Sequence, residues 1–482
     1  MRRAKIVATL GPATESYEMI RAIIEAGVDV TRLNLSHGDY SEHEVRFANV
    51  RKAADDAGRP VAILVDLQGP KIRLGKFSDG PHDLAVGETL RITTEDVVGT
   101  RDLVGTTFKG LAGDVKPGDS LLIDDGKVRV EVTSVDGPVV TTQVVVAGTV
   151  SNNKGINLPG VAVSVPALSE KDEQDLRWGL KAGCDLIALS FVRDAADITR
   201  VHEIMAEEGR KVPVIAKIEK PQAVDNLEEI IDAFDGIMVA RGDLAVELPL
   251  EAVPIVQKRA IELCRRMAKP VIVATQMLES MTHSPVPTRA EASDVANAVL
   301  DGADAVMLSG ESSVGDYPVV TVQTMARIVE STEEHGLDRI RPLVTKPRTQ
   351  GGILTLAAYD IAEFVGAKYV AIFTESGDTA RRMSRLRSGI PMMAFTVDPA
   401  IRRRMALTWG VQSSLVEHVA HTDLMFLQVD DYFLGNGLAA EGDKVVVISG
   451  SPPGIVGGTN DIRVHKIGDA KNGKAPIYKS EQ

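Results

Sequence analysis

The chain has 482 residues, of which 44% are hydrophobic and 25% charged, and its formal net charge is -13. A chain of this length is too long for one hydrophobic core and suggests about three domains. The negative charge argues against nucleic acid or an anionic membrane as the main partner, although a local basic cluster can still bind an anionic substrate.

The two cysteines, Cys184 and Cys264, lie in apolar sequence, which favours buried thiols in a reducing compartment. No apolar run approaches the length of a membrane span, and the N-terminal residues contain no apolar signal core. We therefore expect a cytoplasmic protein without a membrane anchor.

One pattern recurs along the chain: an amphipathic helix, a glycine that ends it, and an aliphatic strand that finishes in polar residues. It predicts eight strands, near residues 5–9, 29–34, 61–66, 186–191, 213–219, 236–241, 270–275 and 304–309. Eight such units favour an α/β fold with a closed (β/α)8 TIM barrel, whose chemistry lies at the C-terminal strand ends. An open, doubly wound sheet is the alternative. Helix starts are indicated by Ser41 with Glu44, by Thr288 with Glu291, and by Pro221.

The third strand is not followed directly by a helix. Short β runs punctuated by glycine occur instead near residues 89–93, 120–124, 127–135 and 139–146. They predict an inserted β-barrel domain, residues 69–165, on a loop at the active face, where it is placed to act as a lid. The catalytic barrel would then comprise residues 1–68 and 166–335.

Beyond residue 335, a polar stretch that contains proline leads into a region that alternates helix and strand. Its strand-like runs lie near residues 367–374, 391–396, 411–416 and 444–449. This alternation predicts a separate C-terminal α/β domain, residues 350–482.

Two carboxylates, Glu219 and Asp243, each end a short apolar run. Charged residues at the ends of buried strands are costly unless they have a role, and oxygen ligands of this kind suit Mg²⁺. Lys217 projects from the same strand face as Glu219 and could meet an anion held on that metal. A structural ion pair in the barrel mouth is the alternative.

Other strand ends add polar side chains to the same face of the predicted barrel. An arginine flanked by neutral oxygen donors on the second strand suits a phosphate and a monovalent cation. The residues concerned are Arg32, Asn34, Ser36, Asp66, Lys71, Arg73 and Thr275. Any one of them is compatible with a solvated rim, but their convergence is hard to explain in that way. Residues 241–244 also open toward a helix, whose free N–H groups would favour a bound carboxylate.

With these residues, the chain resembles the pyruvate kinase family over essentially its whole length. The matching stretches are residues 4–13, 31–38, 66–73, 154–160, 216–220, 238–244 and 274–281. The resemblance implies transfer of phosphate from phosphoenolpyruvate to ADP, which gives pyruvate and ATP in the last step of glycolysis. It also implies a lid, a C-terminal effector domain that regulates activity, and a homotetramer.

The resemblance also implies roles for individual residues. The ligands of Mg²⁺ (or Mn²⁺) would be Glu219 and Asp243, and the lysine that stabilises the transferring phosphoryl group would be Lys217. Substrate contacts would be Arg32, Gly242, Asp243 and Thr275, of which Arg32 and Thr275 would also be catalytic. The K⁺ site would be Asn34, Ser36, Asp66 and the Leu67 carbonyl, and the nucleotide contacts Asn34, Leu35, Ser36, His37, Arg73 and Lys154.

One position departs from a common family pattern. Many family members carry glutamate where this chain has Lys71, and those members need K⁺. An ammonium near the phosphates can take over the role of the alkali cation. We therefore expect K⁺ to be an optional cofactor that turnover does not strictly require.

The C-terminal domain contains its own candidate anion site, between a strand-like run and an arginine-rich helix. Hydroxyls and backbone N–H groups at a helix start suit a phosphate. The residues are Thr374, Ser376, Gly377 and Thr379, which resemble the family's phosphate pocket for a phosphorylated effector. A capped loop without a ligand is the alternative, and the nearby Glu375 and Asp378 favour it.

Two other functions compete with a kinase. A metal-dependent pyruvate lyase would share the Mg²⁺-bound enolate. Such a lyase would not need a nucleotide, whereas Arg73 and Lys154 favour nucleotide binding. A metabolite-sensing scaffold with a dead site would require the loss of Lys217 or a metal ligand, and all of these are present.

Overall fold

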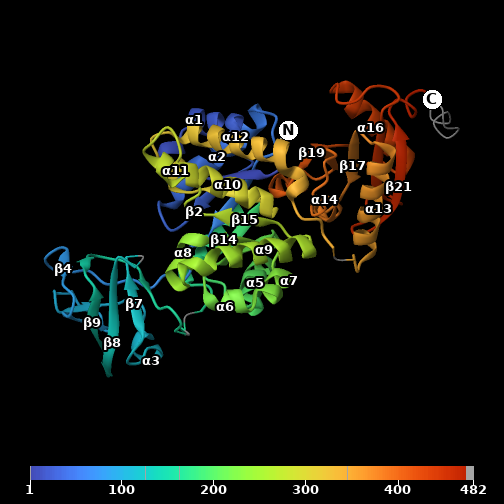
Figure 1. Cartoon of the computed structure of the whole chain (residues 1–482). Coiled ribbons are helices and arrows are strands. Elements are labelled where there is room, and N and C mark those ends of the chain that lie inside the picture. The colour runs from blue at the N-terminus through green and yellow to red at the C-terminus, as the bar shows by residue number, and fades with distance from the viewer. Residues whose placement is uncertain (1, 125, 162, 165, 345, 474–482) are drawn as a thin grey trace.

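The computed structural model describes residues 2–124, 126–161, 163–164, 166–344 and 346–473. A central barrel lies between an all-β insertion on one side and a C-terminal domain on the other (Figure 1). The parts of the predicted domains at residues 1, 125, 162, 165 and 474–482 lie outside the described residues.

Eight parallel strands close the central barrel in the order β1-β16-β15-β14-β13-β12-β3-β2. Their bounds are β1 Lys5–Thr9, β2 Val30–Asn34, β3 Ala62–Asp66, β12 Leu186–Leu189, β13 Val214–Ile218, β14 Gly236–Ala240, β15 Val271–Ala274 and β16 Ala305–Leu308. Nearly every strand residue is buried, as expected when helices cover the outside of a parallel barrel. The predicted closed barrel is confirmed.

Helices surround these strands. They are α1 Tyr17–Ala26, α2 Tyr40–Asp56, α4 Glu170–Ala182, α5 Thr199–Glu207, α6 Pro221–Asp225, α7 Leu227–Ala233, α8 Arg241–Glu247, α9 Val253–Met267, α10 Arg289–Asp301, α11 Gly310–Ser313 and α12 Pro318–Gly336. Short 3₁₀ turns lie at Pro12–Thr14, Ala195–Ile198, Leu250–Ala252, Glu279–Thr282, Leu337–Arg339 and, in the C-terminal domain, Met405–Leu407.

Two of the three predicted helix starts are correct. Thr288 and Glu291 form a reciprocal capping box on α10, and Pro221 opens α6. The start predicted at Ser41 is wrong. Asp39 caps α2, because its carboxylate accepts the Glu42 N–H at 3.0 Å, and the Ser41 hydroxyl donates to that same carboxylate.

The insertion follows β3 and forms two sheets, ordered β11-β7-β8-β9-β5-β6 and β10-β4. Its elements are β4 His82–Leu84, β5 Thr89–Thr93, β6 Leu103–Gly105, α3 Leu111–Asp114, β7 Ser120–Ile123, β8 Val128–Asp136, β9 Val139–Val146, β10 Gly148–Val150 and β11 Ile156–Asn157. Among the described residues, the strands of the insertion form these two sheets and do not pair into a closed ring like that of the central barrel. The domain limits at 68/69 and 165/166 stay a prediction.

The two chain segments that connect the insertion to the barrel run side by side. The Ile156 N–H donates to the Ile72 carbonyl at 2.8 Å, and the Leu74 N–H donates to the Lys154 carbonyl at 2.8 Å. The insertion therefore leaves and re-enters the barrel at one place, close to the end of β3.

The C-terminal domain is built on a sheet ordered β19-β18-β17-β20-β21. Its elements are α13 Gln350–Val365, β17 Tyr369–Phe373, α14 Asp378–Ser384, β18 Met392–Thr396, α15 Pro399–Arg404, β19 Val411–Leu415, α16 Thr422–Gly435, β20 Lys444–Gly450 and β21 Thr459–Lys466. Sequence analysis missed β21, an antiparallel edge strand whose mostly polar residues lack an aliphatic run.

This domain packs against the N-terminal ends of the barrel strands, opposite the catalytic mouth. The Lys5 ammonium on β1 donates to the Val411 carbonyl at 2.8 Å, and Arg403 pairs with the buried Asp185 at 2.9 Å. Cys184 and Cys264 are free and buried, as predicted, and burial raises the pKa of Cys184 to about 12. Among the described residues, no helix has both the length and the apolarity needed to cross a bilayer.

Candidate active site

The barrel brings the predicted charged residues together at the C-terminal ends of its strands. Arg32 lies on β2, Asp66 ends β3, and Lys217 lies on β13. Glu219 follows β13 directly, and Asp243 lies in the first turn of α8, which begins where β14 ends. The predicted convergence on one barrel face is therefore observed.

Lys217 is at the centre of this cluster. Its ammonium lies 2.8 Å from Glu219 Oε1 and 3.5 Å from Asp66 Oδ1, and it donates to the Ser190 hydroxyl at 2.7 Å. Burial acts to lower the pKa of Lys217, but the carboxylates of Asp66 and Glu219 outweigh burial and hold that pKa above its ordinary value. The lysine is therefore a fixed positive charge in a partly desolvated mouth.

The Lys217 ammonium does not fully compensate the burial of the Glu219 carboxylate. Only 1% of it is exposed, and burial raises its pKa although Lys217 acts in the opposite direction. The neighbouring Asp243 raises the pKa of Glu219 further. Two carboxylates that share one ammonium in a buried site form a donor set that suits an added dication, and oxygen ligands match Mg²⁺.

The opposite wall of the mouth carries basic groups. Arg32 pairs with Asp66 Oδ2 at 2.6 Å and donates to the Thr9 hydroxyl at 3.0 Å. Burial lowers the pKa of His37, and the positive charges of Arg73, Lys71 and Arg32 lower it further. These three cations therefore lie near enough to His37 to act on it electrostatically, and together they make this side of the mouth attractive to anions.

Thr275 and Gly242 contact each other directly, since the Gly242 N–H donates to Thr275 Oγ1 at 2.8 Å. This N–H is one of the helix-start groups that the sequence predicted for a bound carboxylate, and here a local hydroxyl accepts it. The contact with a carboxylate stays a prediction. Thr275 has a φ of +69° and Gln276 a φ of +55°, and such left-handed backbone in bulky residues is concentrated at functional sites.

The remaining predicted residues of the mouth lie toward the insertion. Lys154 pairs with Asp124 at 3.0 Å, and Arg73 donates to the Asn153 carbonyl at 3.1 Å, so both cations are held by the insertion. The Lys71 side chain passes close to Gly155. Asn34 accepts the Ser36 N–H at 3.2 Å. Leu35 is buried on the loop between Asn34 and His37.

Sequence analysis did not single out Ser190, although it connects two predicted residues. Its hydroxyl accepts from the Lys217 ammonium and donates to the Leu67 carbonyl at 2.7 Å. The adjacent Phe191 N–H donates to Glu219 Oε2 at 2.8 Å, with Phe191 at a φ of +56°. The signal was available, because Ser190 is a polar residue that ends an aliphatic run.

The predicted effector residues form a separate site in the C-terminal domain. The Thr374 hydroxyl accepts the Gly377 N–H at 2.9 Å, and Thr379 shares a hydrogen bond with Thr459 at 2.8 Å. A cavity of about 420 Å³ opens beside Thr374, Ser376 and Thr379. Asp378 pairs with Arg382 at 2.6 Å, so this basic residue on α14 is partly neutralised.

A barrel mouth with a fixed ammonium, a buried arginine and two adjacent carboxylates fits an enzyme of phosphoryl transfer, which depends on positioning and charge neutralisation. Residues 1–322 match the family model "Pyruvate kinase, barrel domain", and residues 354–465 match "Pyruvate kinase, alpha/beta domain". The chain belongs to the pyruvate kinase family.

Relatives and a solved structure agree with this assignment. The chain is 57% identical to a pyruvate kinase of Mycobacterium intracellulare over 468 residues. That alignment covers 97% of this chain and 99% of the relative. It is 58% identical to a pyruvate kinase of Corynebacterium glutamicum, in an alignment that covers 97% of this chain and 98% of the relative. A pyruvate kinase of Cryptosporidium parvum has a similar structure, with a TM-score of 0.91 at 34% identity, over 97% of this chain and 96% of that one. The chain is thus a glycolytic phosphotransferase that converts phosphoenolpyruvate and ADP to pyruvate and ATP.

Proposed function

We propose that Glu219 and Asp243 hold the divalent cation of this enzyme, Mg²⁺ or Mn²⁺. The observation that carries this proposal is the buried Glu219, whose pKa is raised by burial and by Asp243 despite the contact with Lys217. Pyruvate kinases generally use Mg²⁺ and K⁺. When bound, the dication would neutralise the carboxylate and phosphate oxygens of phosphoenolpyruvate.

Electron paramagnetic resonance of free Mn²⁺ tests the assignment directly. Glu219→Gln and Asp243→Asn should each weaken Mn²⁺ binding strongly, whereas Glu203→Gln on the exposed face of α5 should not. Normal Mn²⁺ binding by both active-site variants would refute the proposed ligands.

The residues around this pair have distinct roles in transfer. Lys217, fixed between Asp66 and Glu219, neutralises charge on the phosphoryl group as it moves from phosphoenolpyruvate to ADP. Arg32 binds the phosphate as a guanidinium fork. Thr275 and Gly242, with Asp243, contact the rest of the substrate from the end of β15 and the first turn of α8.

The nucleotide occupies the mouth on the side of the insertion. Asn34, Leu35, Ser36 and His37 line the loop after β2, and Arg73 and Lys154 belong to the two segments that connect the insertion. Closure of the insertion as a lid would bring these cations onto the ADP phosphates and exclude water. Arg73→Ala should therefore raise KM for ADP more than KM for phosphoenolpyruvate.

Turnover is largely independent of K⁺, because Lys71 supplies a positive charge near the phosphates. Lys71 lies close enough to His37 to lower its pKa. The chain retains the oxygens of Asn34, Ser36, Asp66 and the Leu67 carbonyl, although the Leu67 carbonyl accepts from Ser190 and Asp66 Oδ1 lies 3.5 Å from the Lys217 ammonium. In tetramethylammonium buffer, K⁺ should raise the rate less than about tenfold, or about 1.4 kcal/mol in barrier. Lys71→Glu should create a K⁺ requirement.

The C-terminal domain binds a phosphorylated effector at Thr374, Ser376, Gly377 and Thr379. The cavity of about 420 Å³ beside them supports this site. A thermal-shift screen with AMP, glucose 6-phosphate, ribose 5-phosphate and fructose 1,6-bisphosphate identifies the ligand. Thr379→Val should abolish the shift, and stabilisation that survives this change would place the effector elsewhere.

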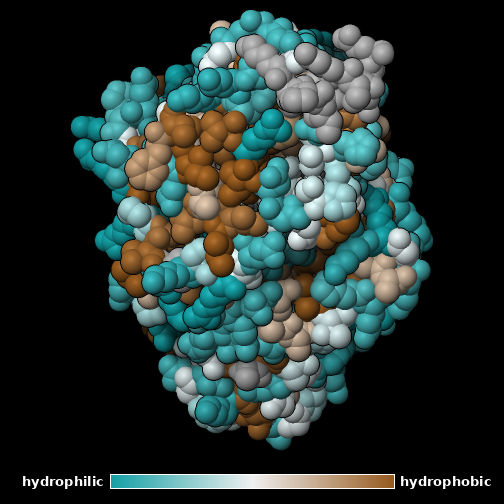
Figure 2. Space-filling view, turned by 90° about the vertical axis from the view of Figure 1, so that its right-hand side faces the viewer, coloured by the Kyte–Doolittle hydropathy of each residue, from teal (hydrophilic) through white to brown (hydrophobic). Residues whose placement is uncertain are grey.

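The enzyme works in the cytoplasm as a homotetramer. Figure 2 shows the face of the molecule on the side of the C-terminal domain, and hydrophobic side chains gather on one area of that face. Exposed hydrophobic residues of this domain include Ile353 and Phe364 on α13, and Phe364 is 88% exposed. Large exposed apolar areas mark interaction sites. Mass photometry of the wild type and of Phe364→Asp tests the assembly.

A further inference from the structure

A buried ion pair joins residues that lie close in sequence to the two proposed metal ligands. Lys220 immediately follows Glu219, and Glu247 lies one helical turn after Asp243, at the end of α8. The Lys220 ammonium is 2.6 Å from Glu247 Oε1, and the two side chains are 15% and 2% exposed. The pair thus connects the chain just after one proposed ligand to the helix that carries the other.

The insertion contacts the same carboxylate. Asn157 lies on β11, which pairs with β7 in the six-stranded sheet of the insertion. Its amide donates to Glu247 Oε1 at 3.2 Å, and Asn157 is only 9% exposed. One oxygen of Glu247 therefore accepts from both the barrel and the insertion.

Phe191 connects the ion pair to Glu219 by a second route. The Lys220 ammonium lies 5.3 Å from the centre of the Phe191 ring, and the Phe191 N–H donates to Glu219 Oε2 at 2.8 Å. A cavity of about 40 Å³ opens between these residues and the connecting segments of the insertion, next to Ile72 and Asn157.

A buried ion pair contributes little net stability, because desolvation of the charges offsets their attraction. We propose that Lys220 and Glu247 are positioning residues that fix the separation of the Glu219 and Asp243 carboxylates, and that Asn157 makes this separation depend on the position of the insertion. The inference rests on the proposed metal ligands. Groups that orient metal-binding side chains commonly affect metal affinity by about 10–100-fold.

Mn²⁺ binding to the enzyme without substrates, followed by electron paramagnetic resonance, is the primary measurement. Glu247→Gln keeps the shape of the side chain and removes its charge, and should weaken Mn²⁺ binding by about tenfold. The Mg²⁺ concentration for half-maximal rate should rise by a similar factor, while kcat at saturating Mg²⁺ changes less.

Two further variants separate positioning from stability. The double variant Lys220→Met with Glu247→Leu leaves no unpaired charge, so it should recover the thermal midpoint lost in Lys220→Met but keep the weak Mn²⁺ binding. Arg387→Met breaks another buried pair, with Asp304 at 3.1 Å beneath the barrel, and should lower stability without weakening Mn²⁺ binding.

Asn157→Ala tests the connection to the insertion. It should weaken Mn²⁺ binding in the wild-type background and have no further effect when combined with Glu247→Gln, because both changes act through one carboxylate. Additive effects would overturn this part of the proposal. Wild-type Mn²⁺ affinity in Glu247→Gln would overturn the whole inference, provided that Glu219→Gln has lost the metal. If Glu219→Gln still binds Mn²⁺, the proposed metal site itself is wrong.

Discussion

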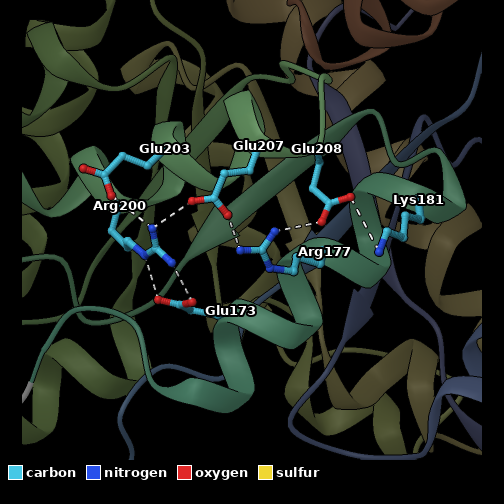
Figure 3. A network of polar contacts seen from close by, with 7 residues as sticks. All are labelled: Glu173, Arg177, Lys181, Arg200, Glu203, Glu207 and Glu208. Carbon is cyan, nitrogen blue, oxygen red and sulfur yellow. Dashed lines mark hydrogen bonds and ion pairs between the residues drawn. The ribbon is translucent and has the colours of Figure 1, made fainter.

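Two charge networks of similar composition lie in very different surroundings. On the outer face of α4 and α5, Arg200 contacts Glu173, Glu203 and Glu207, and Arg177 contacts Glu207 and Glu208 (Figure 3). Arg200 is 41% exposed there, whereas Asp66 and Glu219 at the barrel mouth are each 1% exposed. The outer network has more ion pairs, but water screens each of them.

The comparison shows that the number of ion pairs says little about their importance. Solvent can replace any partner on the outer face, so the loss of one contact changes the free energy of unfolding very little. In the mouth, little solvent can reach a group that has lost its partner, and an unpaired charge there is strongly unfavourable. The mouth should therefore be sensitive to single substitutions that the outer face tolerates.

The largest expected effect on stability is that of Asp66→Asn. It leaves Arg32 and Lys217 without their common carboxylate, and should reduce the free energy of unfolding by about 3–5 kcal/mol. Urea denaturation measures this change. The matched variant on the outer face, Glu173→Gln, should unfold like the wild type. Equal midpoints for the two variants would contradict the comparison.

Lys217→Met should act mainly on catalysis. Loss of one preorganised charge at the transferring group should lower kcat by about 10²–10³-fold. A coupled assay of pyruvate formation measures it. Lys181→Met removes a lysine that lies 3.6 Å from Glu208 on the outer face and should leave kcat unchanged. Full activity of Lys217→Met would refute its role.

Gly69→Ala should have an intermediate effect. Gly69 has a φ of +73°, and a Cβ atom there would lie 2.6 Å from the Phe191 ring. The alanine should cause backbone strain of about 1–3 kcal/mol. It should also displace Phe191, whose N–H donates to Glu219. Gly209 has a φ of +66° with nothing within 4 Å, so Gly209→Ala isolates the strain alone. Only Gly69→Ala should weaken Mn²⁺ binding.

The smallest effect is expected from Arg200→Ala. Although this side chain contacts three glutamates, it is exposed, and we expect no resolvable change in thermal midpoint or kcat. Differential scanning calorimetry at low and high salt checks this. A large loss of stability at low salt would mean that the outer network acts as a cooperative unit.

The barrel and much of its mouth could be predicted from sequence, because aliphatic strands that end in charged residues leave a clear pattern. Lys217 and Glu219 were identified in this way, and they do lie 2.8 Å apart. Ser190 was missed although it ends an aliphatic run. Glu247 was missed because its importance depends on Asn157 and Lys220, which are distant from it in the chain. The edge strand β21 was missed because an exposed strand needs no aliphatic run.

The paired connecting segments of the insertion have a consequence for how the chain folds. β3 and β12 are neighbours in the barrel, yet the whole insertion separates them in sequence. Joining the ends of a long, unfolded loop is entropically unfavourable, and the penalty grows with loop length. An insertion that folds early and holds residues 72 and 156 together shortens the effective loop from residues 67–185 to residues 67–72 and 156–185, and the second of these segments contains α4. Synthesis order favours this route, because the insertion emerges before β12 does.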